Sequence, residues 1–282
     1  MSKLRVALEA AKRQRDGMLA NPSGAARRRS SDEMVSTRFA GDGKIDIANV
    51  RRVEVDWTVL EKNRILSHDT PHRAEGAYRM LRTRIMQKMR SNGWRVLGVS
   101  SIGPNEGKSF TAINLAVSIA AEVGQEALLV DLDLRRPSVH SYFGIDETQF
   151  QGLRQFFENP EQGLEEMIVS PGIDRLGCLL SAVPMERPSD VLASPRGRLF
   201  FEELRRRLPP ETVVVVDLPP LLTVDDALAV APMIDALLFV VAEGNTKRDD
   251  IAEAHQLLQE FNVIGTVLNK SVERENRKDY YY

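Results

Sequence analysis

The sequence predicts an α/β protein built on a mainly parallel sheet with helices on both faces. The first observation is a series of short apolar runs, rich in Val, Leu and Ile, that alternate with segments of helical spacing. Such continuous runs are typical of strands buried on both faces of a parallel sheet. The second is a loop rich in Gly and Pro between one run and the helical segment after it. The third is that two runs end in aspartate.

The apolar spacing gives the order of the elements along the chain. Residues 75–89 carry apolar side chains three and four positions apart, as on one face of a helix, and Gly124 marks the end of a second helix. The expected helices span 75–89, 108–122 and 196–208. The expected strands span 95–100, 127–131, 176–180, 213–217, 236–241 and 263–268.

Composition and pattern divide the chain into four regions. They are a basic, mostly disordered arm (1–44), a transition segment (45–70), the main domain (71–270) and a flexible tyrosine-rich tail (271–282). Up to residue 30 the arm has eight basic side chains against two acidic ones. It is therefore either a solvated tail or a docking arm for acidic lipid or a partner. In the transition segment, alternating apolar residues predict extended pieces at 45–47 and 53–57.

Composition also excludes several classes of protein. The chain has 282 residues, with 38 basic and 40 acidic side chains, so we expect no nucleic-acid partner held by bulk charge. Cys178 is the single cysteine, which rules out an internal disulfide and is typical of an intracellular protein. No run reaches about 18 apolar residues, and no apolar signal segment opens the chain. We expect a cytoplasmic protein that is peripheral to the inner membrane through a partner.

Residues 101–109 read Ser-Ile-Gly-Pro-Asn-Glu-Gly-Lys-Ser between a strand and a helix. A phosphate-binding loop needs inward-facing backbone N–H groups, a lysine for the β- and γ-phosphates, a Ser or Thr for Mg²⁺, and a helix N-terminus. The strict pattern starts with glycine at position 102, where this chain has Ile102 and then Gly103. A glycine-rich turn capping an ordinary helix is the alternative. The context favours ATP contacts from Gly103, Pro104, Asn105, Glu106, Gly107, Lys108, Ser109 and Phe110.

Three aspartates follow strands of the expected sheet. Asp131 and Asp133 come two residues apart, and Asp217 ends a run of four valines. Parallel strands present their carboxyl ends at one edge of the sheet, where α/β folds bind ligands. One strand-end aspartate is often a loop cap. Three of them behind a phosphate loop predict a Mg²⁺ site formed by Ser109, Asp131 and Asp217.

The same stretches carry a resemblance to a known family. The motifs are Tyr78-Arg-Met-Leu-Arg-Thr83, Gly103-Pro-Asn-Glu-Gly-Lys-Ser109, Thr111-Ala-Ile-Asn-Leu-Ala116, Asp131-Leu-Asp-Leu-Arg-Arg-Pro137, Ser194-Pro195, Asp217-Leu-Pro-Pro220, Asp226-Ala227, Val267-Leu-Asn269 and Tyr280-Tyr-Tyr282. In order and spacing they resemble the bacterial tyrosine autokinases (BY-kinases) of the stand-alone CpsD/CapB type. This family lies within the MinD/ParA-like P-loop NTPase superfamily, and the resemblance covers about residues 64–282.

The resemblance implies catalytic roles for several of these side chains. Lys108 would hold the phosphates of ATP, Ser109 and Asp217 would hold Mg²⁺, and Asp131 and Asp133 would polarise the acceptor tyrosine and support the metal. Lys108, Asp131 and Asp133 are thus the expected catalytic residues. Phosphoryl transfer depends mainly on positioning and charge neutralisation, which explains the need for these charged groups.

The remaining residues expected to take part in function are Asn269 and the last three residues of the chain. Asn269 lies where this superfamily reads the adenine, and a turn-forming asparagine is an equal alternative. Tyr280, Tyr281 and Tyr282 are three of the five tyrosines. In the family such a tail enters a neighbouring subunit's active site and is phosphorylated, while a tail without function is the alternative.

The family also carries a Glu-x-x-Arg-x-x-Arg helix that closes a ring of subunits. Arg79 and Arg82 stand at the arginine positions, but Gly76 occupies the glutamate position, so the predicted oligomer contact departs from the pattern. Leu218 stands where the family usually has threonine. The implied partners are further copies of the chain, a membrane chain-length (co-polymerase) protein that activates the kinase, and an antagonistic tyrosine phosphatase.

The sequence therefore predicts a Mg·ATP-dependent tyrosine autokinase that regulates synthesis and export of a cell-surface polysaccharide, such as exopolysaccharide or capsule. One alternative is a ParA/MinD-like ATPase switch, and another is an ATP-binding adaptor without catalysis. The tyrosine tail favours the kinase over the switch. The intact Lys108, Asp131, Asp133 and Asp217 argue against the adaptor.

Overall fold

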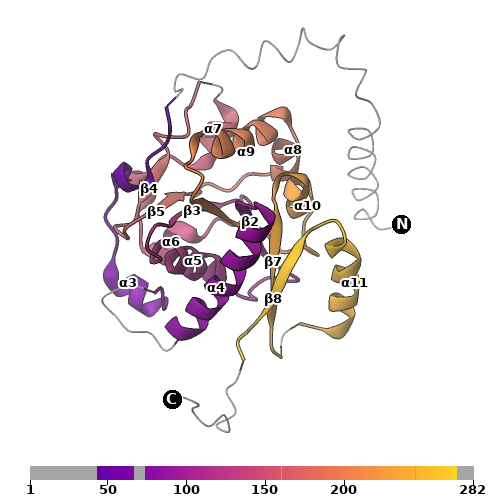
Figure 1. Ribbon diagram of the computed structural model, residues 1–282. Coiled ribbons are helices and arrows are strands. Elements are labelled where there is room, and N and C mark those ends of the chain that lie inside the picture. The colour runs from indigo at the N-terminus through magenta and orange to yellow at the C-terminus, as the bar shows by residue number, and fades with distance from the viewer. Residues whose placement is uncertain (1–42, 67–73, 160, 245, 272–282) are drawn as a thin grey trace, which may run out of the picture.

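One sheet of eight strands forms the centre of the protein (Figure 1). The computed structural model describes residues 43–66, 74–159, 161–244 and 246–271. The strands are β1 (Arg51–Arg52), β2 (Val96–Ser101), β3 (Glu126–Asp131), β4 (Ile168–Ser170), β5 (Leu176–Leu179), β6 (Thr212–Asp217), β7 (Ala236–Ala242) and β8 (Val263–Asn269). Their order is β1-β4-β5-β3-β6-β2-β7-β8, and each neighbouring pair is parallel except β4 with β5. The predicted mainly parallel sheet is confirmed.

The register of the central strands brings the expected functional residues to one edge. Asp131 at the end of β3 pairs with Asp217 at the end of β6. On the other side of β6, Val99 of β2 pairs with the same Asp217. Because these strands are parallel, the loops that follow them share the carboxyl edge of the sheet.

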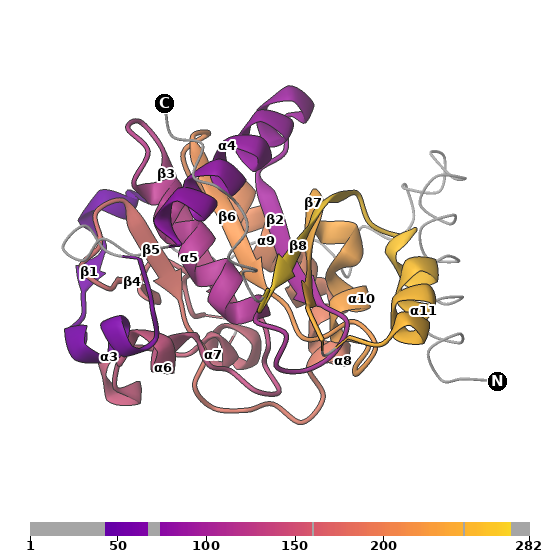
Figure 2. The same cartoon turned by 90° about the horizontal axis from the view of Figure 1, so that it is seen from below.

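Helices cover both faces of the sheet (Figures 1 and 2). One face carries α3 (Trp57–Lys62), α4 (Glu75–Asn92), α5 (Lys108–Ala120) and α6 (Val139–Phe143). The other face carries α7 (Leu153–Glu158), α8 (Pro188–Leu192), α9 (Pro195–Arg207), α10 (Asp226–Val230) and α11 (Arg248–Leu258). Alternate strand residues pack into the two cores, as the period of a buried strand requires.

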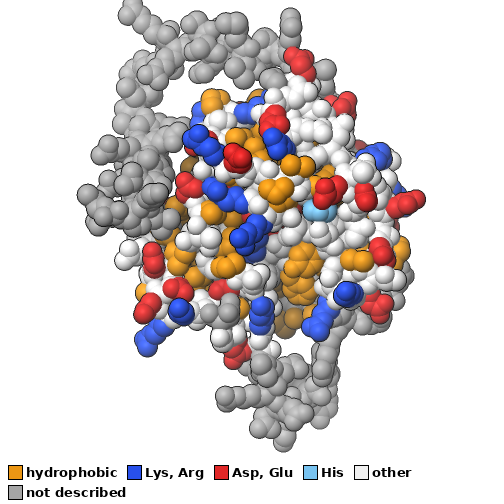
Figure 3. Space-filling model, turned by 180° about the vertical axis from the view of Figure 1, so that it is seen from behind, with side chains coloured by type: hydrophobic (Ala, Val, Ile, Leu, Met, Phe, Trp, Pro, Cys, Tyr) orange, Lys and Arg blue, Asp and Glu red, His pale blue; other side chains and the backbone are white. Residues whose placement is uncertain are grey.

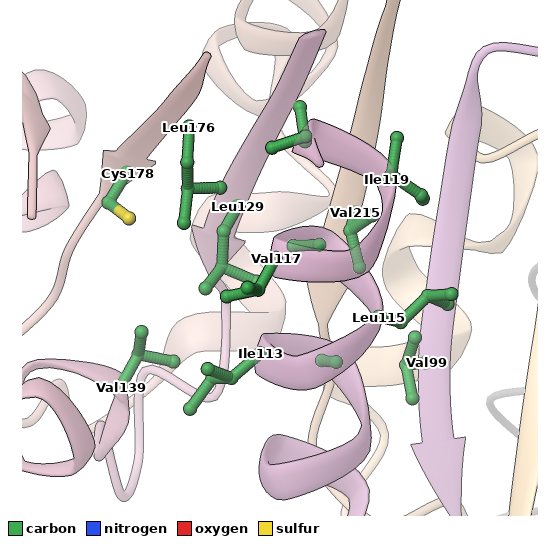
Figure 4. Packing of buried hydrophobic residues seen from close by; sticks show 14 of the residues in the cluster. Val99, Ile113, Leu115, Val117, Ile119, Leu129, Val139, Leu176, Cys178 and Val215 are labelled. Atoms are coloured by element: carbon green, nitrogen blue, oxygen red, sulfur yellow. The ribbon is translucent and has the colours of Figure 1, made fainter. Parts of the chain in front are cut away.

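Helix α5 is buried along nearly its whole length. Its side chains Ile113, Leu115 and Ile119 lie against strand residues that include Val99 and Val215 (Figure 4). A helix that is apolar on most sides belongs inside a protein rather than on its surface. The first residue of this helix is Lys108, so the core holds the expected phosphate-binding lysine in a fixed place.

The transition segment differs from its predicted extended form. Trp57 begins helix α3 because the carboxylate of Asp56 accepts the backbone N–H of Thr58 at 2.9 Å, which caps the helix. A short 3₁₀ turn at Ile47–Asn49 is capped by Asp46 in the same way. The predicted extended pieces at 45–47 and 53–57 are therefore wrong at Ile47 and at Trp57, since aspartate capping overrides the alternating pattern.

The predicted arm and the predicted tyrosine-rich tail lie largely outside the residues that the structure describes. This applies to residues 1–42 of the predicted arm and to 272–282 of the predicted tail, including all three of its tyrosines. Among the described residues, no helix is long and apolar enough to cross a membrane. Acidic and basic side chains are interspersed over the face shown in Figure 3.

Candidate active site

The loop after β2 has the backbone that a phosphate cradle needs. It leads into α5 through Gly107, whose φ of +96° lies in the left-handed region. A Cβ at this position would lie 1.9 Å from Nδ2 of Asn269. Both the dihedral angle and the close approach therefore require glycine here.

Glu106 braces this loop from inside. Its side chain is buried, with Oε2 accepting the backbone N–H of Ile102 at 2.8 Å and Oε1 accepting the hydroxyl of Thr246 at 2.5 Å. Ile102 is buried in the core, which accounts for an apolar residue where the strict motif has glycine. The carboxylate of Glu106 thus shapes the loop, and the nucleotide contact of Glu106 stays a prediction.

The end of β8 clamps the loop from the side. Asn269 donates from Nδ2 to the carbonyl of Glu106 at 2.8 Å, and Lys270 donates from Nζ to the carbonyl of Asn105 at 2.6 Å. The structure thus brings Asn269 to the phosphate loop, as a residue that holds its backbone. The nucleotide contact of Asn269 stays a prediction.

The other predicted loop residues occupy different settings. Pro104 and Asn105 are exposed, and Asn105 has a φ of +60°. The carbonyl of Gly103 accepts the hydroxyl of Ser101 at 2.8 Å. The ring of Phe110 meets the ring of Tyr78 edge to face, with centroids 6.2 Å apart. Because the Phe110 ring packs on α4, a nucleotide contact from this residue would come from its backbone.

Lys108 joins the loop to the aspartates. Its Nζ lies 2.7 Å from Oδ2 of Asp133 and 3.7 Å from Oδ1 of Asp217, and donates to Oγ of Ser109 at 3.1 Å. Burial lowers the pKa of Lys108, but Asp217 and Asp133 outweigh it and raise the pKa above its usual value. The Lys108 side chain is therefore fully protonated, and the aspartates hold it at the edge of the sheet.

Asp131 is held by the helix that follows it. Its Oδ2 accepts the backbone N–H groups of Ser138 and Val139, both at 3.0 Å. The side chain has no exposed area, and burial, followed by the nearby Asp217, raises the pKa of Asp131 to about 8. The first turn of α6 thus fixes this carboxylate beside the other two.

The carboxylate of Asp217 is buried without a hydrogen-bond partner among the described residues. Burial raises the pKa of Asp217, and the Lys108 ammonium opposes this effect. A buried carboxylate in this state normally binds a cation or a donor. The hydroxyl of Ser109 also lies at this site, 3.4 Å from that of Ser138. Mg²⁺ prefers hydroxyl and carboxylate oxygens together with phosphate, so Ser109 and Asp217 fit the ion.

An ion pair that the sequence did not reveal links the loop after β3 to the start of helix α10. Arg135, two residues after Asp133, donates from Nε and Nη2 to the carboxylate of Asp226 at 2.7 and 3.0 Å. Asp226 is fully buried at the start of α10, which follows the loop after Asp217. The motifs Asp131–Pro137 and Asp226-Ala227 gave no sign of pairing because 91 residues separate the partners.

The predicted oligomer residues lie away from this site, on α4. Arg79 is exposed. Arg82 lies 3.2 Å from Glu122 and donates to the carbonyl of Ser118 at 2.8 Å, so its guanidinium is engaged within its own chain. The intersubunit contact stays a prediction for both residues.

Comparison with known proteins agrees with this fold, although no family model matches the chain. The chain is 30% identical over 200 residues to the tyrosine-protein kinase CpsD of Streptococcus pneumoniae, covering 70% of this chain and 85% of that protein. It is 26% identical over 234 residues to the tyrosine-protein kinase etk of Escherichia coli, covering 77% of this chain but 31% of the other.

Solved structures show the same architecture. The chimerical protein CapA2B2 superposes with a TM-score of 0.64 at 25% identity, covering 79% of this chain and 95% of that one. The septum site-determining protein MinD of Pyrococcus horikoshii, in complex with Mg-ADP, shares the fold with a TM-score of 0.50 at 18% identity, covering 64% of this chain and 72% of MinD. The sheet and its loop thus have the MinD-like P-loop fold. With this fold, the chain belongs to the bacterial tyrosine-protein kinases.

Proposed function

We propose that this protein is an ATP- and Mg²⁺-dependent tyrosine autokinase that phosphorylates Tyr280, Tyr281 and Tyr282. Through that modification it regulates the synthesis and export of a cell-surface polysaccharide. The observation that carries the proposal is the contact of Lys108 with Asp133, behind a phosphate loop and beside the carboxylate of Asp217, which has no hydrogen-bond partner among the described residues. Family membership supplies the tyrosine as acceptor.

The side chains divide the work of phosphoryl transfer. Lys108 binds phosphate oxygens, and in doing so its ammonium leaves the carboxylate of Asp133, to which it is bonded at 2.7 Å without ligand. Asp133 is then free to accept the proton of the attacking tyrosine hydroxyl at Oδ2. Ser109 and Asp217 would hold Mg²⁺, with Asp131 supporting them, and the ion would supply positive charge beside the phosphates. Positioning by the buried α5 and α6 supplies the rest.

A membrane chain-length protein is the proposed activator, and a tyrosine phosphatase the antagonist. The chain aligns with 31% of the length of the larger etk protein. In this system, a separate partner protein would take the role that the unaligned part of the etk chain has in that protein. The proposal also places the kinase at the inner membrane through this partner, as an oligomer of identical chains.

A ParA/MinD-like ATPase switch is the second candidate, because the fold is shared with MinD. The two functions differ in the fate of the γ-phosphate. A kinase transfers it to tyrosine, whereas a switch releases it as inorganic phosphate and leaves the protein unmodified.

The test compares phosphotyrosine and released phosphate after adding Mg·ATP to the wild type and to Lys108→Met. We expect phosphotyrosine in the wild type and a loss of at least about 100-fold in the variant, because the cation that meets the phosphates is gone. Lys247→Met removes an exposed lysine outside the site and should behave as wild type. Hydrolysis without phosphotyrosine would favour the switch, and wild-type phosphotyrosine in Lys108→Met would refute the loop assignment.

A further inference from the structure

A segment before the kinase motifs crosses the two helices that carry the site. Residues 56–66, here called the strap, include α3 and the turn after it. Leu60, Ile65 and Leu66 of the strap are buried in the same core as α5 and α6, and α3 lies beside α6 (Figure 2). Besides this apolar packing, two asparagine side chains fix the strap.

Asn114 ties the strap to α5. Its side chain is completely buried, and Oδ1 accepts the backbone N–H of Leu66 at 2.7 Å. Its Nδ2 reaches the carbonyl of Arg64 at 3.4 Å and that of Phe110 at 3.2 Å. Asparagine is a poor residue for a helix interior. Its hydrogen bonds to Leu66 and Arg64 of the strap explain why an asparagine occupies this position.

Asn63 ties the strap to α6. Its Nδ2 donates to the carbonyl of Tyr142 at 3.0 Å. At the end of α6, Gly144 has a φ of +65°, and a Cβ there would lie 3.0 Å from Cβ of Asp56 and 3.1 Å from Cβ of Val59. The strap and α6 therefore meet closely at both ends of α3.

These two helices hold different halves of the site. Helix α5 begins at Lys108 and Ser109, while the first amides of α6 hold the carboxylate of Asp131. The hydroxyls of Ser109 and Ser138 approach to 3.4 Å where the halves meet. A segment fixed to both helices sets the separation of the two halves, and phosphoryl transfer is sensitive to that alignment.

We propose that Asn63 and Asn114 are positioning residues, which act through the strap to keep α6 and Asp131 aligned with Lys108 on α5. The effect on catalysis rests on the proposed kinase function, whereas the effect on α6 does not. Neither asparagine touches the loop at 103–107. The strap therefore governs turnover more than nucleotide affinity.

The variants are Asn63→Ala and the isosteric Asn63→Asp, both of which remove the amide donor, and Asn114→Ala. We expect kcat for tyrosine phosphorylation to fall about tenfold in each, with KM for ATP within about twofold of wild type. Arg64→Gly keeps the carbonyl that Asn114 meets and suits the φ of +56° at this position. It should retain wild-type kcat.

Ile119→Val controls for loss of stability, because Ile119 is buried in α5 and has no polar contact with the strap. If kcat falls only in proportion to lost thermal stability, as in Ile119→Val, the positioning role is refuted. Hydrogen exchange of residues 137–144 gives a readout that needs no kinase activity. We expect faster exchange there in Asn63→Ala and Asn114→Ala than in Ile119→Val. Wild-type exchange in both asparagine variants would overturn the proposal, whatever their activity.

Discussion

At the scale of single residues, the site concentrates negative charge around one lysine. Asp131, Asp133 and Asp217 are all buried at the carboxyl edge of the sheet, and Lys108 contacts two of them. Without a bound cation, the buried carboxylates repel each other and lose solvation. The arrangement therefore lowers the stability of the free protein and suits the binding of Mg²⁺.

Asp217→Asn tests whether the buried carboxylates that suit Mg²⁺ binding also destabilise the free protein. The folded-state pKa of Asp131 lies near 8, above its ordinary value of 3.8, and that of Asp217 is also raised. The folded state thus holds protons that the unfolded state releases, so the free protein should lose stability as the pH rises through this range. Because Asp217→Asn removes one charge, it should raise the melting temperature near pH 8 and flatten the pH dependence.

Thermal unfolding of the nucleotide-free protein across this pH range measures both effects. Phosphotyrosine formation should fall at least about 100-fold in the same variant, because a metal ligand is lost. A lower melting temperature for Asp217→Asn than for wild type near pH 8 would contradict the account.

Sequence reasoning found the residues of the site whose chemistry follows from local spacing. Gly107, Lys108 and Ser109 lie at a strand-to-helix turn, and the aspartates end their strands as expected. The contacts of Glu106 with Thr246 and of Asn114 with Leu66 join positions 140 and 48 residues apart. No local pattern encodes such pairs, because only the folded chain brings the partners together.

At the scale of elements, the Arg135–Asp226 pair should hold the loop after β3 against α10. Arg135→Ala leaves the buried Asp226 carboxylate without its bidentate partner. We expect the free energy of unfolding to fall by about 3 kcal/mol, at the low end for a broken buried pair, because the Arg135 side chain is 33% exposed. Urea unfolding measures this change.

Arg154→Ala is the matched control for that variant. Arg154 pairs with Glu158 at 2.7 Å, but the two side chains are 43% and 53% exposed. Pairs of this kind contribute about 1 kcal/mol or less. Equal losses of stability in Arg135→Ala and Arg154→Ala would show that the pair is not a structural link.

Helix α4 carries the prediction about assembly. If Arg79 and Arg82 contact a neighbouring subunit, Arg79→Ala with Arg82→Ala should shift a large species toward monomer in light scattering. Arg82 also pairs with Glu122 in its own chain, so the double variant loosens α4 as well. Arg90→Ala removes the other partner of Glu122, at 2.9 Å, and controls for that effect. An oligomer of unchanged mass in the double variant would assign α4 to the free surface.

The sequence predicted three of the four long helices and the central strands, but it missed the 11-residue helix α11 and the short helices. Helices α4, α5 and α9 and the central strands lie within a few residues of their predicted bounds. Helices α6, α7, α8 and α10 have five or six residues each, too few for an apolar period to show. Their ends depend on tertiary contacts and caps, which the spacing does not report.

At the scale of the whole molecule, the chain leaves the sheet beside its own phosphate loop. Strand β8 ends at Asn269, and Lys270 contacts the carbonyl of Asn105. The twelve residues 271–282 therefore start at the catalytic edge, and an extended chain of this length spans about 40 Å. The proposal that the tyrosines enter the active site of a neighbouring copy depends on this reach.

Mapping of phosphotyrosine by mass spectrometry, after incubation with Mg·ATP, tests the central claim most directly. The chain has five tyrosines, so every possible site can be assigned. The account predicts phosphate on Tyr280, Tyr281 and Tyr282 in the wild type, and none in Lys108→Met or when the three are changed to Phe. Phosphate mainly on Tyr78 or Tyr142, or hydrolysis of ATP with every tyrosine unmodified, would contradict it.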